Sequence, residues 1–341
     1  MKVHLAATHE AEHLWVSTFH DRARSSKMHQ VVANPVDADL IMLLGVFGME
    51  PARLLGHPIY RTFPDRCAVY NEEDAYLPLV PGIYCSARRD EHSRIGRVFS
   101  YAYISRNGRH HNPFLAEVSG ERVIQAAPAR RFLFSFQGGS TSMVRKRLFN
   151  LSFGREDVLI ENTSSFHNWD GSQPGRRERQ LRYAETIASS HFVLCPRGAG
   201  TGSIRFFEVM ASGVAPVLIS DDYELPVGPA WDEFLIRVAE RDIARLPMIL
   251  EGYVATAEER GRLAQRAFVE YFSIEHEFDQ VVGLASRSLR HAGPSEEQFR
   301  RRQPAMIRRA ERRRKVRQFF RTAALKLLHG LRLKNPYQMN R

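Results

Sequence analysis

Residues 191–250 constrain the fold of this chain more than any other part of its 341 residues. An apolar run at 192–195 is followed by a glycine-rich loop at 196–202, a helical pattern at 203–211 and a second apolar run at 214–220. This succession predicts one βαβ unit, whose two strands lie in the same sheet. Because the helix N-terminus of such a unit gathers unpaired backbone N–H groups and the positive end of the helix dipole, the segment also predicts an anion site.

The loop of this unit favours a diphosphate as the anion. Arg197 and Arg205 bracket it, and Gly198, Gly200 and Gly202 lie between them. Glycine lets backbone amides approach phosphate oxygens, although a tight turn between a strand and a helix needs glycine for its geometry alone. The spacing matches neither the G-x-G-x-x-G dinucleotide fingerprint nor a P-loop ending in Lys-Ser/Thr, so both of those interpretations are disfavoured.

Charged side chains flank the loop on both sides. Arg205 and Glu208 are three residues apart and share a helix face, where a guanidinium fork suits phosphate and a carboxylate can accept hydrogen bonds from ribose hydroxyls. The alternative is a surface ion pair, which is common and of little energetic value. Asp221 and Asp222 follow the second strand without D-x-D spacing, so solvated acids or hydrogen-bond acceptors for a sugar are favoured over metal ligands.

The positive charge of the chain is concentrated at its C-terminal end. The formal net charge is +11, but residues 300–341 contain 15 Lys and Arg and a single Glu, so the remainder has a net charge of −3. This distribution disfavours nucleic-acid binding as the role of the whole protein. Apolar residues recur at helical spacing in the tail (Val316, Phe319, Phe320, Ala323, Leu327 and Leu331). A basic amphipathic helix on an anionic membrane surface is predicted, with a helix packed on the body or a nucleic-acid arm as alternatives.

Cysteine usage and hydropathy set the expected compartment. The three cysteines show no CxxC spacing, which argues against a disulfide framework and against a zinc site. The N-terminal residues lack the apolar core of a signal peptide, and no window reaches the length of a transmembrane span. We therefore expect a cytoplasmic protein.

The remaining sequence alternates apolar runs with helical patterns, which indicates two α/β halves. Strands are expected in the first half at 2–6, 39–46, 66–70, 82–86 and 97–104, with a helix at 10–24 and irregular, proline-rich segments at 54–64 and 77–81. After a linker at 126–131, strands are expected at 131–136, 157–161 and 234–238, and helices at 142–153, 178–190, 241–251, 255–272 and 274–290. Such paired halves commonly hold a nucleotide at the carboxyl ends of their strands.

Two segments resemble one enzyme family. CPRGAGTGSIRFFEVMASGVAPVLISDDYELP (195–226), followed by WDEF, is similar to the exostosin family of glycosyltransferases, particularly its bacterial members. RRFLFSFQGGSTSMVRKRLF (130–149) resembles the strand, glycine and helix segment at the start of that family's donor domain. The resemblance covers about 131–250, and residues 37–41 only loosely suggest the family's N-terminal half.

The resemblance implies an α/β fold of GT-B architecture, with two Rossmann-like α/β/α domains facing a central cleft. We expect an acceptor-side domain at 1–128, a donor domain at 129–292 and the basic helical tail at 293–341. The resemblance also implies a nucleotide-sugar donor that is UDP-linked, an inverting transfer, and neither a metal nor a cofactor. By matching position, the donor would contact Gly138, Gly139, Arg145, Arg197, Gly198, Ser203, Arg205, Glu208 and Asp222.

The base that an inverting transfer requires is less closely defined. Glu73 and Asp74 directly follow the strand expected at 66–70, where active-site loops of such sheets lie, and we rank them first. Other acids and histidines of the first half remain open: Glu72, Asp90, His92, His110 and His111. His167 and Asp170 either contact the acceptor or belong to a plain surface loop.

The sequence thus predicts an inverting, metal-independent glycosyltransferase that acts on a glycan or lipid-linked acceptor in cell-surface polysaccharide synthesis. It would be cytoplasmic and peripheral on the inner membrane face, bound there through residues 300–341, with no nucleic-acid partner. Two alternatives stay open at this point. One is a catalytically inactive glycan-binding or assembly protein on the same fold, and the other is a nucleic-acid binder acting through the tail.

Overall fold

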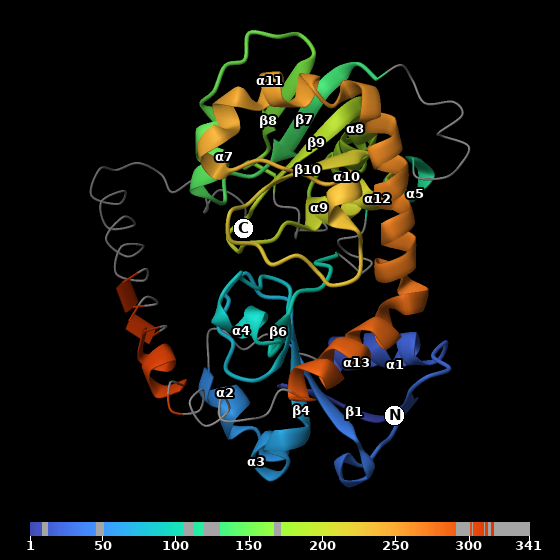
Figure 1. Cartoon of the computed structure of the whole chain (residues 1–341), viewed down its shortest axis with the longest axis vertical. Coiled ribbons are helices and arrows are strands. Elements are labelled where there is room, and N and C mark those ends of the chain that lie inside the picture. The colour runs from blue at the N-terminus through green and yellow to red at the C-terminus, as the bar shows by residue number, and fades with distance from the viewer. Residues whose placement is uncertain are drawn as a thin grey trace.

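The chain builds two parallel β-sheets with helices packed against them, as its computed structural model shows (Figure 1). The structure describes residues 1–8, 13–45, 51–104, 112–118, 130–166, 172–290, 301, 303–309, 311–312 and 315–316. The first sheet contains β1 (Lys2–Ala7), β2 (Gln30–Val31), β3 (Leu40–Leu44), β4 (Cys67–Asn71), β5 (Gly82–Tyr84) and β6 (Val98–Phe99). The second contains β7 (Phe132–Gly138), β8 (Val158–Asn162), β9 (Ser190–Pro196), β10 (Ala215–Ile219) and β11 (Ile236–Arg237).

Both sheets have the same strand order. The first runs β2-β1-β3-β4-β5-β6 and the second β11-β10-β9-β7-β8, so in each the first strand along the chain lies between the second and the third. Connections therefore leave in opposite directions from β1 and β3, and again from β7 and β9. In open parallel sheets a ligand crevice forms at the carboxyl edge of such a switch point. The α/β class predicted from the sequence is confirmed.

Helices cover both faces of each sheet, which explains why the central strands are buried throughout. The helices of the first half are α1 (His13–Ala23), α2 (Pro51–Gly56), α3 (Pro58–Thr62), α4 (Glu91–Arg94) and α5 (Pro113–Val118). Those that follow are α7 (Met143–Phe149), α8 (Arg176–Ala188), α9 (Ile204–Ala211), α10 (Trp231–Phe234), α11 (Leu246–Glu251), α12 (Ala257–Phe272) and α13 (Ile274–Arg290). Along β3, Leu40, Met42 and Leu44 face one apolar core while Ile41 and Leu43 face another.

The last two long helices, α12 and α13, connect the two sheets. α12 packs against α9 and β10 in the second half, whereas α13 returns to pack on β4, β5 and α1 in the first (Figure 1). The buried carboxylate of Glu277 in α13 lies 3.3 Å from Nε of Arg22 in α1. One core cluster continues from the first half into the second, with Phe19 and Phe278 at one end and Phe206 and Phe272 at the other. The two halves therefore share apolar packing as well as a chain connection.

The βαβ unit at 191–250 is present as predicted. β9, α9 and β10 follow one another, and Phe192 pairs in parallel with Ala215. The helix ends at Gly213, whose φ of +69° is the left-handed conformation that glycine adopts most readily. Since local periodicity and a helix-ending glycine were both visible in the sequence, this unit was its most predictable part.

Proline accounts for two differences from the sequence predictions. Residues 54–64 were expected to be irregular, but α2 and α3 occupy most of this segment, because their prolines Pro51 and Pro58 open the helices, where a missing N–H costs nothing. The single helix expected at 241–251 is instead a 3-10 turn, Glu240–Arg245, followed by α11. Pro247 in the first turn of α11 lacks the amide that a continuous helix would need.

Other predicted segments are shorter than expected or lie outside the described residues. Only Val98–Phe99 of the strand expected at 97–104 pairs in the sheet, and the short edge strand β2 was not predicted. Most of the expected linker at 126–131 and the apolar tail residues after Val316 are not described, and the domain boundaries remain predictions. In the described part of the tail, Met306 and Ile307 pack against the first half.

Candidate functional site

A cavity of about 910 Å³ lies at the carboxyl edge of the second sheet, and the first half contributes part of its wall. Its floor is formed by the end of β7, the loop after β9 and the N-terminus of α9, at the switch point of that sheet. The first half contributes Asp74, Tyr103 and Asn112 to its wall. Of the predicted donor contacts, Gly138, Gly139, Arg145, Gly198, Ser203, Arg205 and Glu208 line this cavity.

Two arginines lie together in the floor of the cavity. Arg145 is only 8% exposed, and its Nε and Nη2 donate to the Pro196 carbonyl at 3.2 and 3.0 Å. Nη2 of Arg205 donates to the carbonyl of Gln137, and the Arg205 guanidinium carbon lies 4.6 Å from the centroid of the Phe136 ring. Backbone carbonyls and aromatic faces therefore hold both guanidiniums in place.

Among the described residues this arginine pair forms no ion pair, and the buried Nε of Arg205 has no hydrogen-bond partner there. Burial, and then the neighbouring Arg205 guanidinium, lower the pKa of Arg145 to about 9. An anion placed between the two would offset both effects, because it supplies the missing negative charge and hydrogen-bond acceptors.

The N-terminus of α9 adds backbone donors to the same place. Ser203 is the N-cap residue and makes no side-chain capping bond; its Oγ lies instead 3.5 Å from Nη2 of Arg145. The first amides of a helix have no partner within the helix, and Ile204 and Arg205 in this first turn line the cavity. Helix N–H groups and two guanidiniums thus converge on one small region.

The glycines of the floor divide into two kinds. A Cβ added to Gly198 would have its nearest neighbour at 3.7 Å, which is ordinary contact, and this residue faces the cavity. A Cβ on Gly138 would come within 3.0 Å of Nη2 of Arg205. At Gly200 and Gly202 the obstacle is the first half, with the Asp74 carbonyl oxygen at 2.9 Å and the Cys85 carbonyl oxygen at 3.1 Å. The absent side chains of the loop thus serve the contact between the halves as well as the cavity.

Glu208 is held from the opposite side of the cavity by Tyr183 of α8. The phenol of Tyr183 donates to Oε2 of Glu208 at 2.7 Å, and burial raises the pKa of this phenol well above its ordinary value. The structure shows no ion pair between Arg205 and Glu208, so the surface ion pair considered for them is not the arrangement found in the described residues. The Tyr183 phenol instead holds the carboxylate in position through Oε2.

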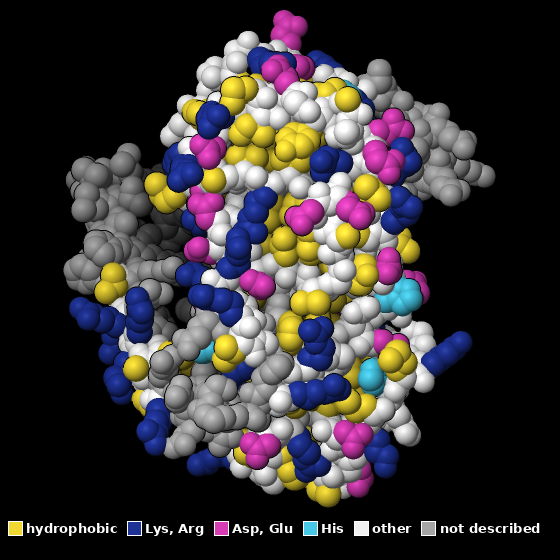
Figure 2. Space-filling model, viewed as in Figure 1, with side chains coloured by type: hydrophobic (Ala, Val, Ile, Leu, Met, Phe, Trp, Pro, Cys, Tyr) yellow, Lys and Arg dark blue, Asp and Glu magenta, His cyan; other side chains and the backbone are white. Residues whose placement is uncertain are grey.

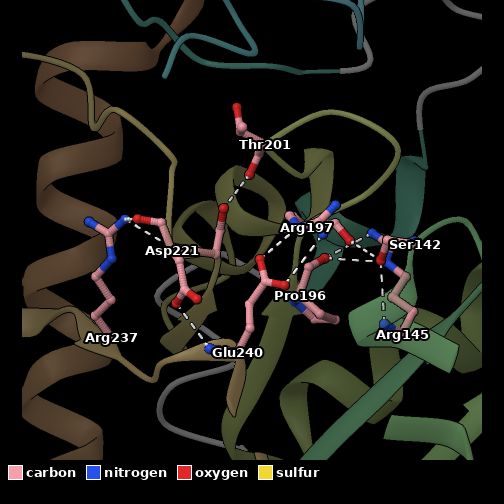
Figure 3. A network of polar contacts seen from close by, with 9 residues as sticks. Ser142, Arg145, Pro196, Arg197, Thr201, Asp221, Arg237 and Glu240 are labelled. Carbon is pink, nitrogen blue, oxygen red and sulfur yellow. Dashed lines mark hydrogen bonds and ion pairs between the residues drawn. The ribbon is translucent and has the colours of Figure 1, made fainter. Parts of the chain in front are cut away.

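Two of the predicted donor contacts lie elsewhere. Arg197 forms a two-pronged ion pair with Glu240, at 2.6 Å from Nε and 3.3 Å from Nη2, and does not line the cavity (Figure 3). Asp222 lies where the acidic loop meets the first half, and its carbonyl accepts a hydrogen bond from the Arg89 amide at 2.9 Å. The structure therefore brings neither residue to the cavity, because each belongs to a contact with a partner far away in the sequence.

Of the two first-ranked candidates for the base, only Asp74 lines the cavity. Its Oδ1 accepts a hydrogen bond from the Gly200 amide at 3.2 Å, across the junction of the halves. Glu73 turns instead toward Asn71, whose side-chain nitrogen lies 3.4 Å from its Oε2. Among the alternatives, Glu72 accepts from the Tyr70 phenol at 2.6 Å. Asp90 caps α4, which also carries His92, and His110, His111, His167 and Asp170 lie outside the described residues.

Several lining residues were not anticipated. Tyr183 lies in a helix that was predicted but whose inner face was not identified, and Tyr103 follows the short strand β6. Asn112 donates to the Gln180 carbonyl at 2.9 Å and ties the first half to α8. The aromatic residues before position 105 were a visible sequence signal for Tyr103, whereas no local sequence pattern identified Asn112.

The described residues also bear on whether the protein could hold a metal ion or cross a membrane. Within those residues, no group of three or more His, Cys, Asp or Glu side chains is placed to hold a metal ion. No helix of that same part combines the length and the apolar character required to cross a bilayer.

Comparison with known proteins gives one family. Residues 85–253 match the exostosin GT47 domain. The chain is 35% identical over 134 residues to an exostosin-1 homolog of Caenorhabditis elegans and 31% identical over 157 residues to exostosin-1 of Drosophila melanogaster. It is 40% identical over 83 residues to a probable glucuronosyltransferase of rice, Oryza sativa subsp. japonica. These matches cover 36%, 42% and 24% of this chain and 35%, 21% and 19% of the respective relatives, so the chain spans about a third or less of their length.

Proposed function

We propose that the chain is a glycosyltransferase of the exostosin family that uses a nucleoside-diphosphate sugar, because residues 85–253 match the GT47 domain of that family. We further propose that its two halves form a GT-B architecture whose cleft is the 910 Å³ cavity. The donor, a UDP-sugar, binds to the second half, and a glycan or lipid-linked acceptor approaches from the first. The observation that carries this proposal is the pair of neighbouring arginines at the N-terminus of α9, which form no ion pair with a carboxylate of the described residues.

The diphosphate occupies the region between Arg145, Arg205 and the first turn of α9. Both guanidiniums can donate to phosphate oxygens there, and the helix dipole favours negative charge at the same end. Glu208, held by Tyr183, accepts hydrogen bonds from the ribose hydroxyls. Gly198 keeps the approach to the phosphates open, because no side chain projects from it.

The proposed reaction inverts the configuration of the transferred sugar and uses no metal. Asp74 removes the proton of an acceptor hydroxyl as its oxygen forms a bond to the anomeric carbon of the donor. The bond from that carbon to the β-phosphate oxygen breaks, and its electron pair leaves with UDP. Arg145, Arg205 and the α9 amides stabilise the departing charge, and since they are already in place no reorganisation is needed during the reaction.

Nucleotide binding tests the donor site. Isothermal titration with UDP is expected to show micromolar binding to the parent chain and binding at least about tenfold weaker for Arg205→Ala and Glu208→Ala, since a charged hydrogen bond is lost in each. Arg155→Ala serves as the control, because Arg155 is a surface residue paired with Asp157 and Glu251 outside the cavity. A parent chain that binds no UDP, or cavity variants that bind as well as Arg155→Ala, would refute the proposal.

Turnover separates an enzyme from a binding protein on the same fold. A panel of UDP-sugars offered with oligosaccharide acceptors is expected to yield product with the parent chain. Asp74→Asn should retain UDP binding and lose at least about a hundredfold in kcat, as expected for removal of a general base. Equal turnover by the parent and Asp74→Asn would exclude Asp74 as the base. UDP binding without turnover of any donor would favour a binding protein.

We also propose that the tail binds an anionic membrane surface. In its described part Arg301, Arg308, Arg309, Arg312 and Lys315 are exposed, while Met306 and Ile307 pack on the first half (Figure 2). Each basic residue near an anionic bilayer contributes about 1 kcal/mol to binding. Cosedimentation with vesicles containing phosphatidylserine should require residues 300–341, and the truncated chain should still bind UDP. Full cosedimentation of the truncated chain would contradict this anchoring role.

A further inference from the structure

The two walls of the cavity differ in charge. Arg145 and Arg205 lie in the floor at the second half. The wall from the first half contributes Asp74 and Tyr103 instead. A negatively charged donor is therefore drawn to one side only. The other side has to recognise something different.

Asp74 is held firmly in that wall. The Gly200 amide donates to its Oδ1 at 3.2 Å, and this is the hydrogen bond that the structure gives its carboxylate among the described residues. Gly200 itself is buried against Asp74 and Ser86, with no room for a Cβ. The carboxylate thus has one oxygen fixed by the second half and its other oxygen available to a ligand. Its position is set by both halves together.

Tyr103 lies beside this carboxylate. Its side chain is half-buried and lines the cavity. Burial raises the pKa of the Tyr103 phenol, and the charges of Asp74, Glu72 and the Cys85 thiol raise it further. Each of these three neighbours is a group that becomes negatively charged when it ionises. The Tyr103 phenol stays protonated, and the cavity wall beside it carries the Asp74 carboxylate.

We propose that Tyr103 and Asp74 form the acceptor subsite, and that this subsite takes an uncharged sugar terminus and rejects a uronic acid. The Tyr103 ring offers an apolar face with a polar tip, against which the carbon-bound face of a sugar can pack. The Asp74 carboxylate accepts hydrogen bonds from sugar hydroxyls, which are donors. A carboxylate on the incoming sugar would lie near Asp74 and be repelled, so the wall discriminates by exclusion.

The cavity is large for a site that holds one ligand. Pockets for one drug-sized ligand span roughly 300–1,000 Å³, and this one, at about 910 Å³, is near the upper end of that range. The inference rests on the proposed function, because it places the acceptor opposite a nucleotide donor. It goes beyond that function by assigning Tyr103 to the acceptor and by predicting the charge of the acceptor.

Saccharide binding in the presence of saturating UDP tests this subsite. The probes are matched disaccharide pairs in gluco and galacto configuration, each pair differing only in whether C6 of the terminal sugar is a hydroxymethyl group or a carboxylate. Titration of the parent chain is expected to show at least one neutral member that binds about tenfold or more tightly than its uronate partner, as expected for two like charges a few ångströms apart. Equal or tighter binding of the uronates, or binding of no neutral saccharide, would overturn the inference.

Variants distinguish the two residues. Asp74→Asn keeps an oxygen to accept from the Gly200 amide and removes the charge, so the preference for the neutral saccharide should fall below about threefold. Tyr103→Ala should weaken binding of the neutral saccharide about tenfold, whereas Tyr103→Phe, which keeps the ring, should stay within about threefold. An unchanged preference in Asp74→Asn, or equal binding by Tyr103→Ala and Tyr103→Phe, would refute the corresponding role.

The UDP titration separates this inference from the function on which it rests. No variant should bind UDP more than about twofold more weakly than the parent chain, because the Tyr103 and Asp74 side chains donate nothing to the diphosphate and the Asp74 charge, which acts on Arg145, opposes an anion there. If the parent chain fails to bind UDP, the proposed donor site is wrong. If UDP binds but the saccharide preference is absent, only the acceptor subsite is wrong.

Discussion

Gly200 offers a sharp test of the junction between the halves. A methyl group at this position would lie 2.9 Å from the Asp74 carbonyl oxygen, 3.0 Å from the Asp74 Cα and closer still to Oγ of Ser86. Two of these three atoms are backbone, so a side-chain rotation cannot relieve the crowding. Gly200→Ala must therefore push the loop away from the first half or shift the segment that carries Asp74. Overpacking of this kind destabilises a protein by about 1–3 kcal/mol.

The assay is thermal unfolding with and without UDP. The melting temperature of Gly200→Ala should fall by roughly 2–8 °C. The matched control is Gly198→Ala in the same loop, where the nearest atom is 3.7 Å away and the melting temperature should change by less than about 1 °C. Because the displaced segment carries the proposed base, Gly200→Ala should also lose kcat while its UDP affinity stays within a few fold of the parent. A Gly200→Ala chain that is as stable as Gly198→Ala and as active as the parent would refute the close contact of the halves.

Three further predictions follow from the cavity and from α13. UDP affinity should fall as the pH rises through about 9, because the pKa of Arg145 in the free protein is lowered to that value. Titrations at pH 7.5 and 10 should show a larger fall in affinity for the parent than for Arg145→Gln. Equal falls would contradict the lowered pKa of Arg145. Gly138→Ala should weaken UDP binding by about tenfold in the same titration, because the added Cβ would lie 3.0 Å from Nη2 of Arg205 and displace that guanidinium. Unchanged affinity would show that Arg205 adjusts at no cost. Arg22→Ala should lower the free energy of unfolding by about 3 kcal/mol, because the buried Glu277 carboxylate loses its contact with the Arg22 guanidinium. Adding Glu277→Gln should recover part of this free energy in denaturant unfolding. No recovery would show that the lost ion pair does not cause the destabilisation.

Local patterns in the sequence were sufficient for the central elements of the fold. The βαβ unit at 191–250 was predictable because helix and strand periodicity, glycine at the turn and glycine at the helix end all agreed. The short strand β2 was not, since two paired residues leave no periodicity to detect, and of the strand expected at 97–104 only the two residues of β6 pair in the sheet. At 241–251 the apolar spacing was correct, but Pro247 interrupts the hydrogen bonds that a single helix would need.

The site was predictable where its residues are neighbours in the sequence. Arg205 was identified because it adjoins the glycine-rich loop, whereas Ser203 was identified through the family resemblance. Arg197 shares that loop but lies outside the cavity, and the reason is Glu240, its partner 43 positions away. The contact between Asp74 and Gly200 spans 126 positions and depends on how the two sheets pack. Such pairs are set by tertiary packing, for which one sequence carries no local signal.

The repeated strand order bears on which half would hold which substrate in the proposed reaction. Because both sheets have a switch point, topology alone offers a crevice at β1 and β3 as well as at β7 and β9. The side chains that line the cavity distinguish the crevice of the second sheet from that of the first. The second sheet brings Arg145, Arg205 and a helix N-terminus to its switch point, whereas the first contributes Asp74 from the segment after β4. A base on one wall and cations on the other place proton removal and departure of the diphosphate on opposite sides of the transferred sugar, which is the arrangement that the proposed inversion requires.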